Sequence, residues 1–301
     1  MSIDGLHLLL TYQCNYECDH CFVWGGPHQY GTMTLDNIAE ILRQAQDVGC
    51  VEWIYFEGGE PFLYYAALRR GVEMAAGAGF KVGIVSNAYW ATGTEDALAC
   101  LAPFSGLVQD FSISSDAYHW GDADDRQSRT AQNAARKLGI PLDVISIAPP
   151  EATHAEAGRG QIAPGESAVV FRGRAAQRLA ERADTHPWEQ FTECPFEDLR
   201  EPGRVHLDAL GHVHICPGLT IGNLFKQPLA ELFDAYDSAT HPVTGPLLDG
   251  GPAELVRRYD LPCRDRYCDA CHLCDTARRL LRPRFPEVLA PDQMYGGCAP
   301  G

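Results

Sequence analysis

Three cysteines near the start of the chain constrain its structure more than any other feature. Cys14, Cys18 and Cys21 fall within eight residues and follow directly on the apolar run Leu6–Leu10. Three thiolates can hold an iron–sulfur cluster and leave one iron without the fourth protein ligand that electron-carrying clusters usually have. The spacing therefore predicts a cluster with one open iron, at which chemistry can take place.

Two other interpretations of these cysteines stay open. Positions 14, 18 and 21 would share one face of a helix, where the thiols would simply be buried. Asn15, Asp19 and the pair Gly25–Gly26 favour a loop instead, and the preceding apolar run is too short for a helix. Clustered cysteines can also begin a zinc site.

The cysteine spacing, with His20 directly before the third cysteine, resembles the signature of the radical S-adenosylmethionine (SAM) superfamily. In that superfamily the open iron of a [4Fe-4S] cluster chelates SAM, and the reduced cluster cleaves SAM to methionine and a 5′-deoxyadenosyl radical. The resemblance implies that Cys14, Cys18 and Cys21 are cluster ligands and catalytic residues here, and that the backbone at His20 contacts SAM. That chemistry belongs to the cofactors, which the protein holds and orients.

The composition is typical of a cytoplasmic globular protein. No stretch nears the roughly 18 consecutive apolar residues of a membrane span, and the segment Met1–Asp4 lacks the features of a secretory signal. Twelve clustered cysteines without an export signal indicate metal binding rather than disulfides. The formal net charge of −16 disfavours a large nucleic-acid interface, which needs a basic surface. We expect neither nucleic acid nor a membrane as a partner.

The first half of the chain alternates short apolar runs with helix-like stretches, which is typical of a mostly parallel sheet with crossover helices. Strands are expected at 6–12, 51–56, 81–85, 108–114, 141–147 and 167–171, and helices at 34–48, 63–76, 95–101, 125–138 and 175–183. Six such units predict an α/β fold, a partial (β/α)6 barrel, which the resemblance also implies. Functional groups should lie at the carboxyl ends of the strands. The Pro- and Gly-rich stretch 149–166 is expected to be a loop and a candidate lid.

The second expected strand is followed by Glu57-Gly58-Gly59-Glu60-Pro61. This segment resembles the Gly-Gly-Glu-Pro motif of radical SAM enzymes, which implies that residues 58–61 bind SAM. Paired glycines let the backbone approach a ligand where a β-carbon would block it, and the proline ends the strand. Taken alone, the segment is equally typical of an ordinary connection between a strand and a helix.

Polar residues also follow the third and fourth expected strands. By the resemblance, Asn87, Ser114 and Asp116 meet the carboxylate and ribose of SAM, although such residues favour strand exits for their turn chemistry as well. Asp116 and His119 are close enough in sequence for one to orient the other, or to form a solvated loop pair. The Gly-x-Ile-x-Gly-x-x-Glu pattern that many family members carry after the fifth strand is missing, so the adenine contacts stay mostly unassigned.

Arg172 opens the helix after the sixth expected strand, in the segment Phe171–Ala175. Its guanidinium group and the free helix N-terminus would favour a carboxylate, either that of SAM or that of the substrate. A pair of surface arginines, Arg172 and Arg174, is the alternative interpretation.

Seven of the twelve cysteines lie after position 190. The hairpin-like segment 205–216 ends in a cysteine and is followed by Gly-Asn and a helix, which resembles the SPASM or twitch extension of radical SAM enzymes. That extension carries auxiliary iron–sulfur clusters, so at least one, expected to be [4Fe-4S], is implied here. The expected ligands are Cys194, Cys216, Cys271 and Cys274, with Cys268 as the substitute. The run 263–274 departs from the full SPASM spacing, and a zinc site is the alternative.

Together these resemblances predict an enzyme in two parts, a radical SAM partial barrel at residues 1–185 and an auxiliary iron–sulfur cluster domain at residues 186–301. The radical should abstract hydrogen from a substrate, expected to be a ribosomally synthesised peptide or a natural-product intermediate. A reductant such as flavodoxin or ferredoxin would supply the electrons.

Two other functions remain open. One is a radical SAM dehydrogenase of a small molecule, since the first strand begins too close to the N-terminus to leave room for a leader-recognition domain. The other is a non-catalytic iron–sulfur or zinc protein, which would not explain why the first cluster has three cysteines rather than four.

Overall fold

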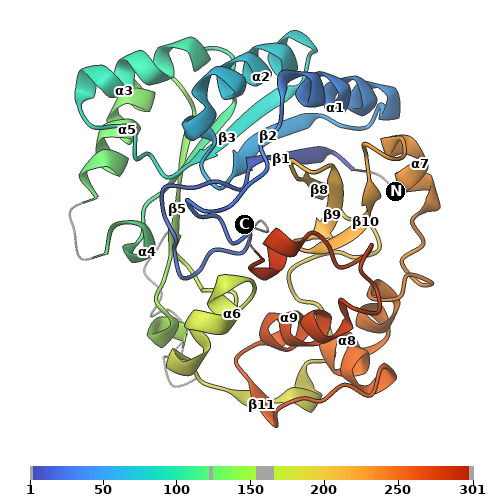
Figure 1. Cartoon of the computed structure of the whole chain (residues 1–301). Helices are drawn as coiled ribbons and strands as arrows, with labels where there is room; N and C mark the ends of the chain where they lie inside the picture. Colours follow the sequence, from blue (N-terminus) through green and yellow to red (C-terminus); the bar gives the residue numbers. More distant parts are fainter. Residues whose placement is uncertain (1–2, 122–124, 154–165, 298–301) are drawn as a thin grey trace.

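A nine-stranded sheet with helices packed on it forms the main body of the protein (Figure 1). The computed structural model describes residues 3–121, 125–153 and 166–297. Six parallel strands follow one another across the sheet in chain order: β1 (Gly5–Thr11), β2 (Trp53–Gly58), β3 (Lys81–Ser86), β4 (Asp110–Ser114), β5 (Leu142–Ile147) and β6 (Glu166–Ser167). This arrangement confirms the predicted α/β fold.

The crossover helices gather on one face of the sheet, as Figure 1 shows. They are α1 (Leu35–Val48), α2 (Tyr65–Gly77) after the short helix η1 (Pro61–Tyr64), α3 (Thr94–Leu101) followed by η2 (Ala102–Phe104), and α5 (Arg126–Lys137) after α4 (Ala117–Trp120). Helix α1 begins and ends where expected, because the Thr34 hydroxyl accepts the N–H of Asn37 and Gly49 takes the left-handed conformation at its end.

Alternate side chains of each strand point to opposite faces of the sheet. On β1, Leu6, Leu8 and Leu10 are fully buried in the core. On β2, Phe56 packs beneath the helices, where a β-carbon added at Gly71 would lie 2.8 Å from its ring. The residues between these apolar positions face the inside of the partial barrel, and they are more polar.

Three strands from the C-terminal part extend the same sheet beyond β1. Strand β8 (Arg204–Leu207) pairs in parallel with β1, and β9 (His212–Cys216) and β10 (Leu219–Asn223) continue in antiparallel order. The strand order is therefore β10-β9-β8-β1-β2-β3-β4-β5-β6. The domain boundary that we expect at residue 185 stays a prediction, and the sheet runs across it.

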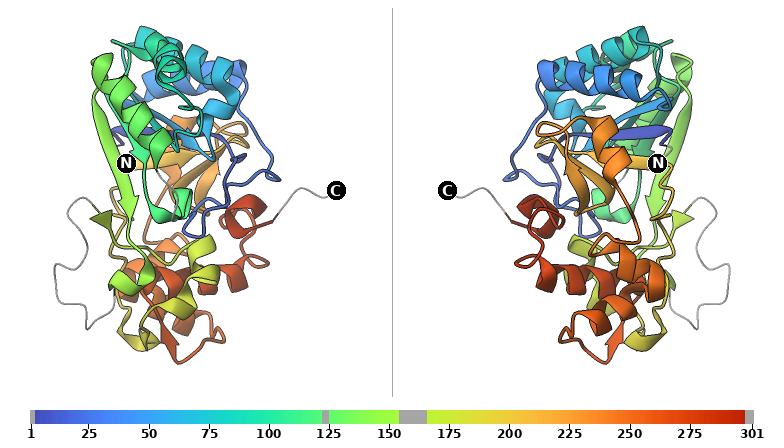
Figure 2. Two further views of the ribbon diagram at one scale, coloured as in Figure 1. Left: turned by 90° about the vertical axis from the view of Figure 1, so that its left-hand side faces the viewer. Right: turned by 90° about the vertical axis from the view of Figure 1, so that its right-hand side faces the viewer.

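Most of the remaining elements lie against the end of the barrel at which the cysteine loop, residues 12–34, emerges (Figure 2). They are α6 (Arg174–Arg178), η4 (Ala180–Arg182), β7 (His186–Pro187), η5 (Trp188–Gln190), α8 (Thr244–Arg258), β11 (Arg266–Tyr267), α9 (Ala270–Leu281) and η6 (Asp292–Tyr295). Helix α7 (Leu229–Ala235) lies beside α1 instead, where the N–H of Leu229 donates to the Gln44 side chain. None of the described helices combines the length and the apolar character that a membrane crossing requires.

The chain after β5 differs from the expectation. The sixth strand is only Glu166–Ser167, and the helix expected at 175–183 is split into α6 and η4. Contacts with distant segments accompany this difference, because the N–H of Phe171 donates to the Asp269 carboxylate and the N–H of Arg174 donates to the carbonyl of Cys21. These two backbone N–H groups therefore bond to the N-cap of α9 and to the cysteine loop, and not to a neighbouring strand. The expected lid at 149–166 begins with η3 (Pro150–Thr153), and most of it lies outside the described residues.

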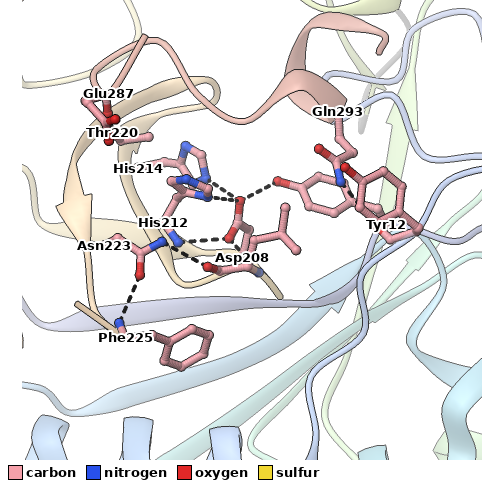
Figure 3. A network of polar contacts seen from close by, with 11 residues as sticks. Tyr12, Asp208, His212, His214, Thr220, Asn223, Phe225, Glu287 and Gln293 are labelled. Atoms are coloured by element: carbon pink, nitrogen blue, oxygen red, sulfur yellow. Dashed lines mark hydrogen bonds and ion pairs between the residues drawn. The ribbon is translucent and has the colours of Figure 1, made fainter. Parts of the chain in front are cut away.

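A buried polar cluster fixes the added hairpin against β1 (Figure 3). The Asp208 carboxylate accepts the Tyr12 hydroxyl at 2.8 Å and lies 3.1 and 3.2 Å from ring nitrogens of His212 and His214. Burial raises the pKa of Asp208, but the two histidines outweigh burial and hold the pKa below its usual range. An ionised carboxylate with one partner directly after β1, Tyr12, and two on β9 sets the position of the hairpin on the sheet.

Candidate active site

The three cysteines of the first motif line one cavity at the carboxyl ends of the strands. The cavity has a volume of about 290 Å³, and Cys14, Cys18 and Cys21 all border it. The N–H of Tyr16 donates to the Cys14 sulfur at 3.4 Å, and the N–H of Gly25 donates to the Cys21 sulfur at 3.2 Å. Burial raises the pKa of Cys14 to about 12, so that the thiolate form requires a nearby cation. Three cysteines that border one cavity, two of them with backbone N–H groups donating to their sulfur atoms, fit an iron–sulfur cluster.

The loop that carries these cysteines is not helical, which removes the interpretation as a stripe of thiols on one helix. Its two limbs are held together by isolated bridges, Thr11 with Thr32 and Gln13 with Gly26. The buried Arg174 also stabilises the loop, since its guanidinium donates at 2.8 Å to the carbonyl of Cys18 and at 2.8 Å to that of Gly25. The sequence offers Arg174 only as a surface neighbour of Arg172, whereas the structure buries it.

The turn after β2 approaches the cysteine loop so closely that only glycine fits. A β-carbon on Gly59 would lie 2.1 Å from the Gln13 carbonyl oxygen, and one on Gly58, at a φ of +135°, would lie 2.4 Å from that of Thr11. The N–H of Gly59 donates to Thr11 at 2.7 Å, and the N–H of Glu60 donates to Gln13 at 2.8 Å. Both glycines line the cavity, as the motif predicts for a backbone approach to SAM.

The side chains of Glu60 and Pro61 do not line this cavity, which differs from the expectation. Glu60 is fully buried, and its carboxylate accepts the Ser86 hydroxyl at 2.9 Å, the N–H of Asn87 at 2.8 Å and that of Phe62 at 3.0 Å. Burial raises the pKa of Glu60 to about 7 in spite of these bonds. The Glu60 side chain thus holds the ends of β2 and β3 together, and Pro61 begins η1.

Asn87, Ser114 and His20 line the same cavity as the cysteines, in keeping with the roles predicted for them. The side-chain amide of Asn87 donates to the Asn15 oxygen at 2.9 Å and lies 3.6 Å from the Cys14 sulfur. The ends of β3 and β4 therefore present polar groups beside the cluster site. Whether they contact SAM stays a prediction.

Asp116 lies behind the cavity wall rather than on it. Its carboxylate caps α4 by accepting the N–H groups of Tyr118 and His119, and it lies 2.8 Å from Nδ1 of His119 and 3.6 Å from Nε2 of His20. The His20 ring stacks on Tyr118 with the ring centroids 4.6 Å apart. Burial lowers the pKa of His20 to about 4. Asp116 therefore orients the rings of His119 and His20.

Arg172 lies between this cavity and a second, smaller one, and it lines both. Its guanidinium forms an ion pair with Glu197 at 3.2 Å and lies over the Phe22 ring at 5.1 Å. The carboxylate facing Arg172 in the structure is therefore the protein's own. A contact with SAM or with a substrate carboxylate stays a prediction.

Four C-terminal cysteines line the second cavity: Cys194, Cys216, Cys271 and Cys274. The fully buried Arg278 lies beside them, with its guanidinium 3.9 Å from the Cys216 sulfur and donating to the Pro217 carbonyl at 2.9 Å. Four thiols are a suitable donor set for an iron–sulfur cluster or a zinc ion. The buried cation beside them would offset the negative charge of the thiolates.

The expected substitute ligand, Cys268, does not line the second cavity. Its thiol donates to the Ala180 carbonyl at 3.3 Å and belongs to a separate apolar cluster. Cys268 precedes the N-cap of α9, Asp269, whereas Cys271 and Cys274 lie three residues apart on the helix itself. The start of the helix therefore decides which cysteines reach the cavity.

Comparison with known proteins identifies the first part of the chain. The family model of the radical SAM superfamily matches residues 8–150. YydG of Bacillus subtilis strain 168, named for peptide biosynthesis, is 28% identical over 111 residues, which are 36% of this chain and 35% of YydG. An S-adenosylmethionine-dependent nucleotide dehydratase of Selenomonas ruminantium is 36% identical over 84 residues, 27% of this chain and 29% of the dehydratase. The matches thus span about a third of each relative.

A solved structure resembles nearly the whole chain. BtrN, in complex with AdoMet (SAM) and 2-DOIA, has a TM-score of 0.55 to this structure at 15% identity, over 91% of this chain and 93% of BtrN. At this identity the likeness concerns the fold, and it extends from the barrel into the cysteine-rich part.

Proposed function

We propose that the chain is a radical SAM enzyme, because residues 8–150 match the family model of the radical SAM superfamily, and that it cleaves SAM reductively and uses the radical to modify a ribosomally synthesised peptide or natural-product intermediate. The observation that carries this proposal is the cavity bordered by three cysteines on one side and by Gly58 and Gly59 on the other. Three sulfur ligands leave one iron of a cluster free, and the cavity provides space next to it.

A [4Fe-4S] cluster held by Cys14, Cys18 and Cys21 would bind SAM at its open iron and supply the electron that cleaves it. The chain's own residues shape the space around that event. The glycine turn lets the backbone reach the ligand, and Asn87 and Ser114 offer polar groups to it. Apolar walls, made by Val23, Val85, Ile145, Ile147 and Val169, exclude water from a reactive radical.

We assign the second cavity to an auxiliary iron–sulfur cluster, expected to be [4Fe-4S], with Cys194, Cys216, Cys271 and Cys274 as its ligands. Such a cluster would accept an electron from the substrate or bind it. Arg172 lines both cavities, so its positive charge would stabilise negative charge at either cluster site. A flavodoxin or ferredoxin in the cytoplasm is the reductant we expect.

A peptide substrate is supported by the partial match to YydG, which is named for peptide biosynthesis. The second candidate is dehydrogenation of a small molecule, since BtrN shares this fold over nearly its whole length and its structure contains 2-DOIA. Both reactions begin with the same hydrogen abstraction, so that one assay tests their common part.

The test is the formation of 5′-deoxyadenosine and methionine by anaerobically reconstituted, reduced protein supplied with SAM. The wild-type protein should form both products, and Cys21→Ala should form neither. Cys50→Ala is the matched control, because Cys50 lines neither cavity. The proposal fails if wild-type protein loaded with cluster forms no 5′-deoxyadenosine. Peptides encoded near the gene and small polyols, added separately, then distinguish the two substrate classes by the mass of the product.

A further inference from the structure

Two histidines and a glutamate meet on the inner face of the sheet, apart from both sets of cysteines. His7 lies on β1, Glu57 on β2 and His206 on β8, which are neighbouring parallel strands. His7 pairs directly with His206, and Glu57 lies on the same face of the next strand, two residues beyond the partner of His7. One nitrogen or oxygen atom of each side chain lies within 4.8 Å of the others.

The three side chains converge without bonding well to one another. Oε2 of Glu57 lies 3.3 Å from Nδ1 of His7, and Oε1 lies 3.2 Å from Nε2 of His206. Even so, Nδ1 of His7 and Oε1 of Glu57 are buried atoms without a hydrogen-bond partner among the described residues. Two ligands that each lie about 2.0–2.1 Å from a tetrahedral metal ion are about 3.4 Å apart. The two carboxylate–imidazole separations, one from each oxygen of Glu57, are close to this value.

Glu57 is also buried without an ion pair to a lysine or arginine among the described residues. The side chains of His7, Glu57 and His206 are 18%, 13% and 8% exposed, and in the described part of the chain Glu57 forms ion pairs with these histidines alone. A carboxylate this far out of water is costly unless a cation lies beside it. A metal ion between the three side chains would supply that charge.

Neighbouring residues hold the group in place and leave it accessible. Tyr55 stacks on the His7 ring, with centroids 4.5 Å apart, and its hydroxyl donates to Asp110 at 2.9 Å. Glu57 lines the cavity that contains the first three cysteines, whereas His7 lines another cavity at the opposite end of the strands. A ligand could therefore reach the group from the side on which the cysteines lie.

We propose that His7, Glu57 and His206 bind one divalent metal ion through two imidazole nitrogens and a carboxylate, with an open position for an oxygen of the substrate. Two histidines and one carboxylate are a common donor set for zinc and for ferrous iron. A substrate carboxylate or hydroxyl on the ion would be fixed beside the SAM site. This last step rests on the proposed function, whereas the metal site itself does not.

Zinc is the probe, because its X-ray absorption separates the proposed site from the cysteines. One equivalent of Zn²⁺ is added anaerobically to protein whose iron–sulfur clusters have been reconstituted, without SAM or reductant. We expect one bound zinc per chain with about four nitrogen or oxygen neighbours at about 2.0–2.1 Å and no sulfur at about 2.3 Å. Three neighbours come from the protein and one from solvent at the open position.

The variant Glu57→Gln keeps the side chain's size and should weaken zinc binding at least about tenfold. Tyr55→Phe is the matched control, because it keeps the ring that stacks on His7, and its affinity should equal that of the wild type. His7→Asn is the second variant if Glu57→Gln does not fold. Absence of bound zinc in the wild type, sulfur neighbours around it, or equal affinity in every folded variant would overturn the site. The measurement needs no SAM cleavage, so a protein that binds zinc here but forms no 5′-deoxyadenosine overturns the proposed function alone.

Discussion

The two cysteine sites of this protein are built in different ways. At the first site, three cysteines of one short loop border a cavity of about 290 Å³, and the opposite wall is a glycine turn. At the second site, four cysteines from three separate segments surround a cavity of about 20 Å³, beside the buried Arg278. A site with three thiols and free space suits a reactive ligand, whereas a closed site with four thiols suits electron storage. From this difference we propose that SAM is cleaved at the first site and that the second site stores or transfers an electron.

The largest expected effect separates the two sites directly. Cys18→Ala and Cys274→Ala should each lower the iron content of reconstituted protein by about four atoms per chain, one [4Fe-4S] cluster. Only Cys18→Ala should abolish 5′-deoxyadenosine formation, because Cys274 lines the second cavity alone. Iron analysis and chromatography of the products check both statements. If Cys274→Ala also abolished SAM cleavage in protein with an intact first cluster, the division of roles would be wrong.

The next prediction concerns the glycine turn that only the first site has. Gly59→Ala places a β-carbon 2.1 Å from a backbone oxygen of the cysteine loop. We expect a loss of several kcal/mol, about 3 or more, in the free energy of unfolding, together with loss of SAM cleavage. Gly77→Ala is the control, because its β-carbon would meet nothing within 4 Å at the end of α2. Urea unfolding of the three proteins measures the difference, and similar midpoints for Gly59→Ala and the wild type would contradict the prediction.

The cation beside the second site gives a third, smaller effect. Arg278→Met removes a positive charge whose nitrogen lies 3.9 Å from the Cys216 sulfur. The reduced cluster should lose stabilisation, and its reduction potential should fall by on the order of 100 mV, from a unit charge roughly 5 Å away at an effective dielectric constant of about 20. Arg258→Gln, at an exposed position on α8, should leave the potential unchanged. A redox titration followed by electron paramagnetic resonance measures both, and a site without any redox signal would show that zinc is bound instead.

The same contrast explains what could be predicted from the sequence. The first site is local: the spacing of Cys14, Cys18 and Cys21 and the glycine pair at the end of the next strand are visible in the chain itself. Strands β1 to β5 and helix α1 were also predictable, because their apolar periodicity and the cap at Thr34 are local signals. Each of these features depends on interactions between residues that are close in sequence.

The rest depends on contacts between distant segments. The sequence makes Cys268 a substitute for the four expected ligands, whereas the structure places it before the N-cap of α9, with its thiol against Ala180. The pairing of β8 with β1 brings His206 to His7 across most of the chain. Neither the composition nor the spacing of these residues specifies such a pairing, because register is set by the packed sheet as a whole.

The smallest effect tests how the strand ends at the first site are held. Glu60 binds a proton more readily in the folded protein, because burial raises its pKa to about 7, well above the value of a carboxyl group in the unfolded chain. Between about pH 4.5 and pH 7 the folded state then holds the extra proton, so that this residue's contribution to stability falls as the pH rises and is constant above about pH 8. The variant Glu60→Gln cannot titrate at this position. From pH 5 to pH 8 the wild type should therefore lose about 2 kcal/mol more of its free energy of unfolding than the variant does. Urea unfolding at both pH values gives that difference, with Glu52→Gln, an exposed residue at the opposite end of β2, as the control. If wild type and variant differed by the same free energy of unfolding at both pH values, Glu60 would be ionised throughout. It would then be a fixed charge beside the first site, as Arg278 is beside the second.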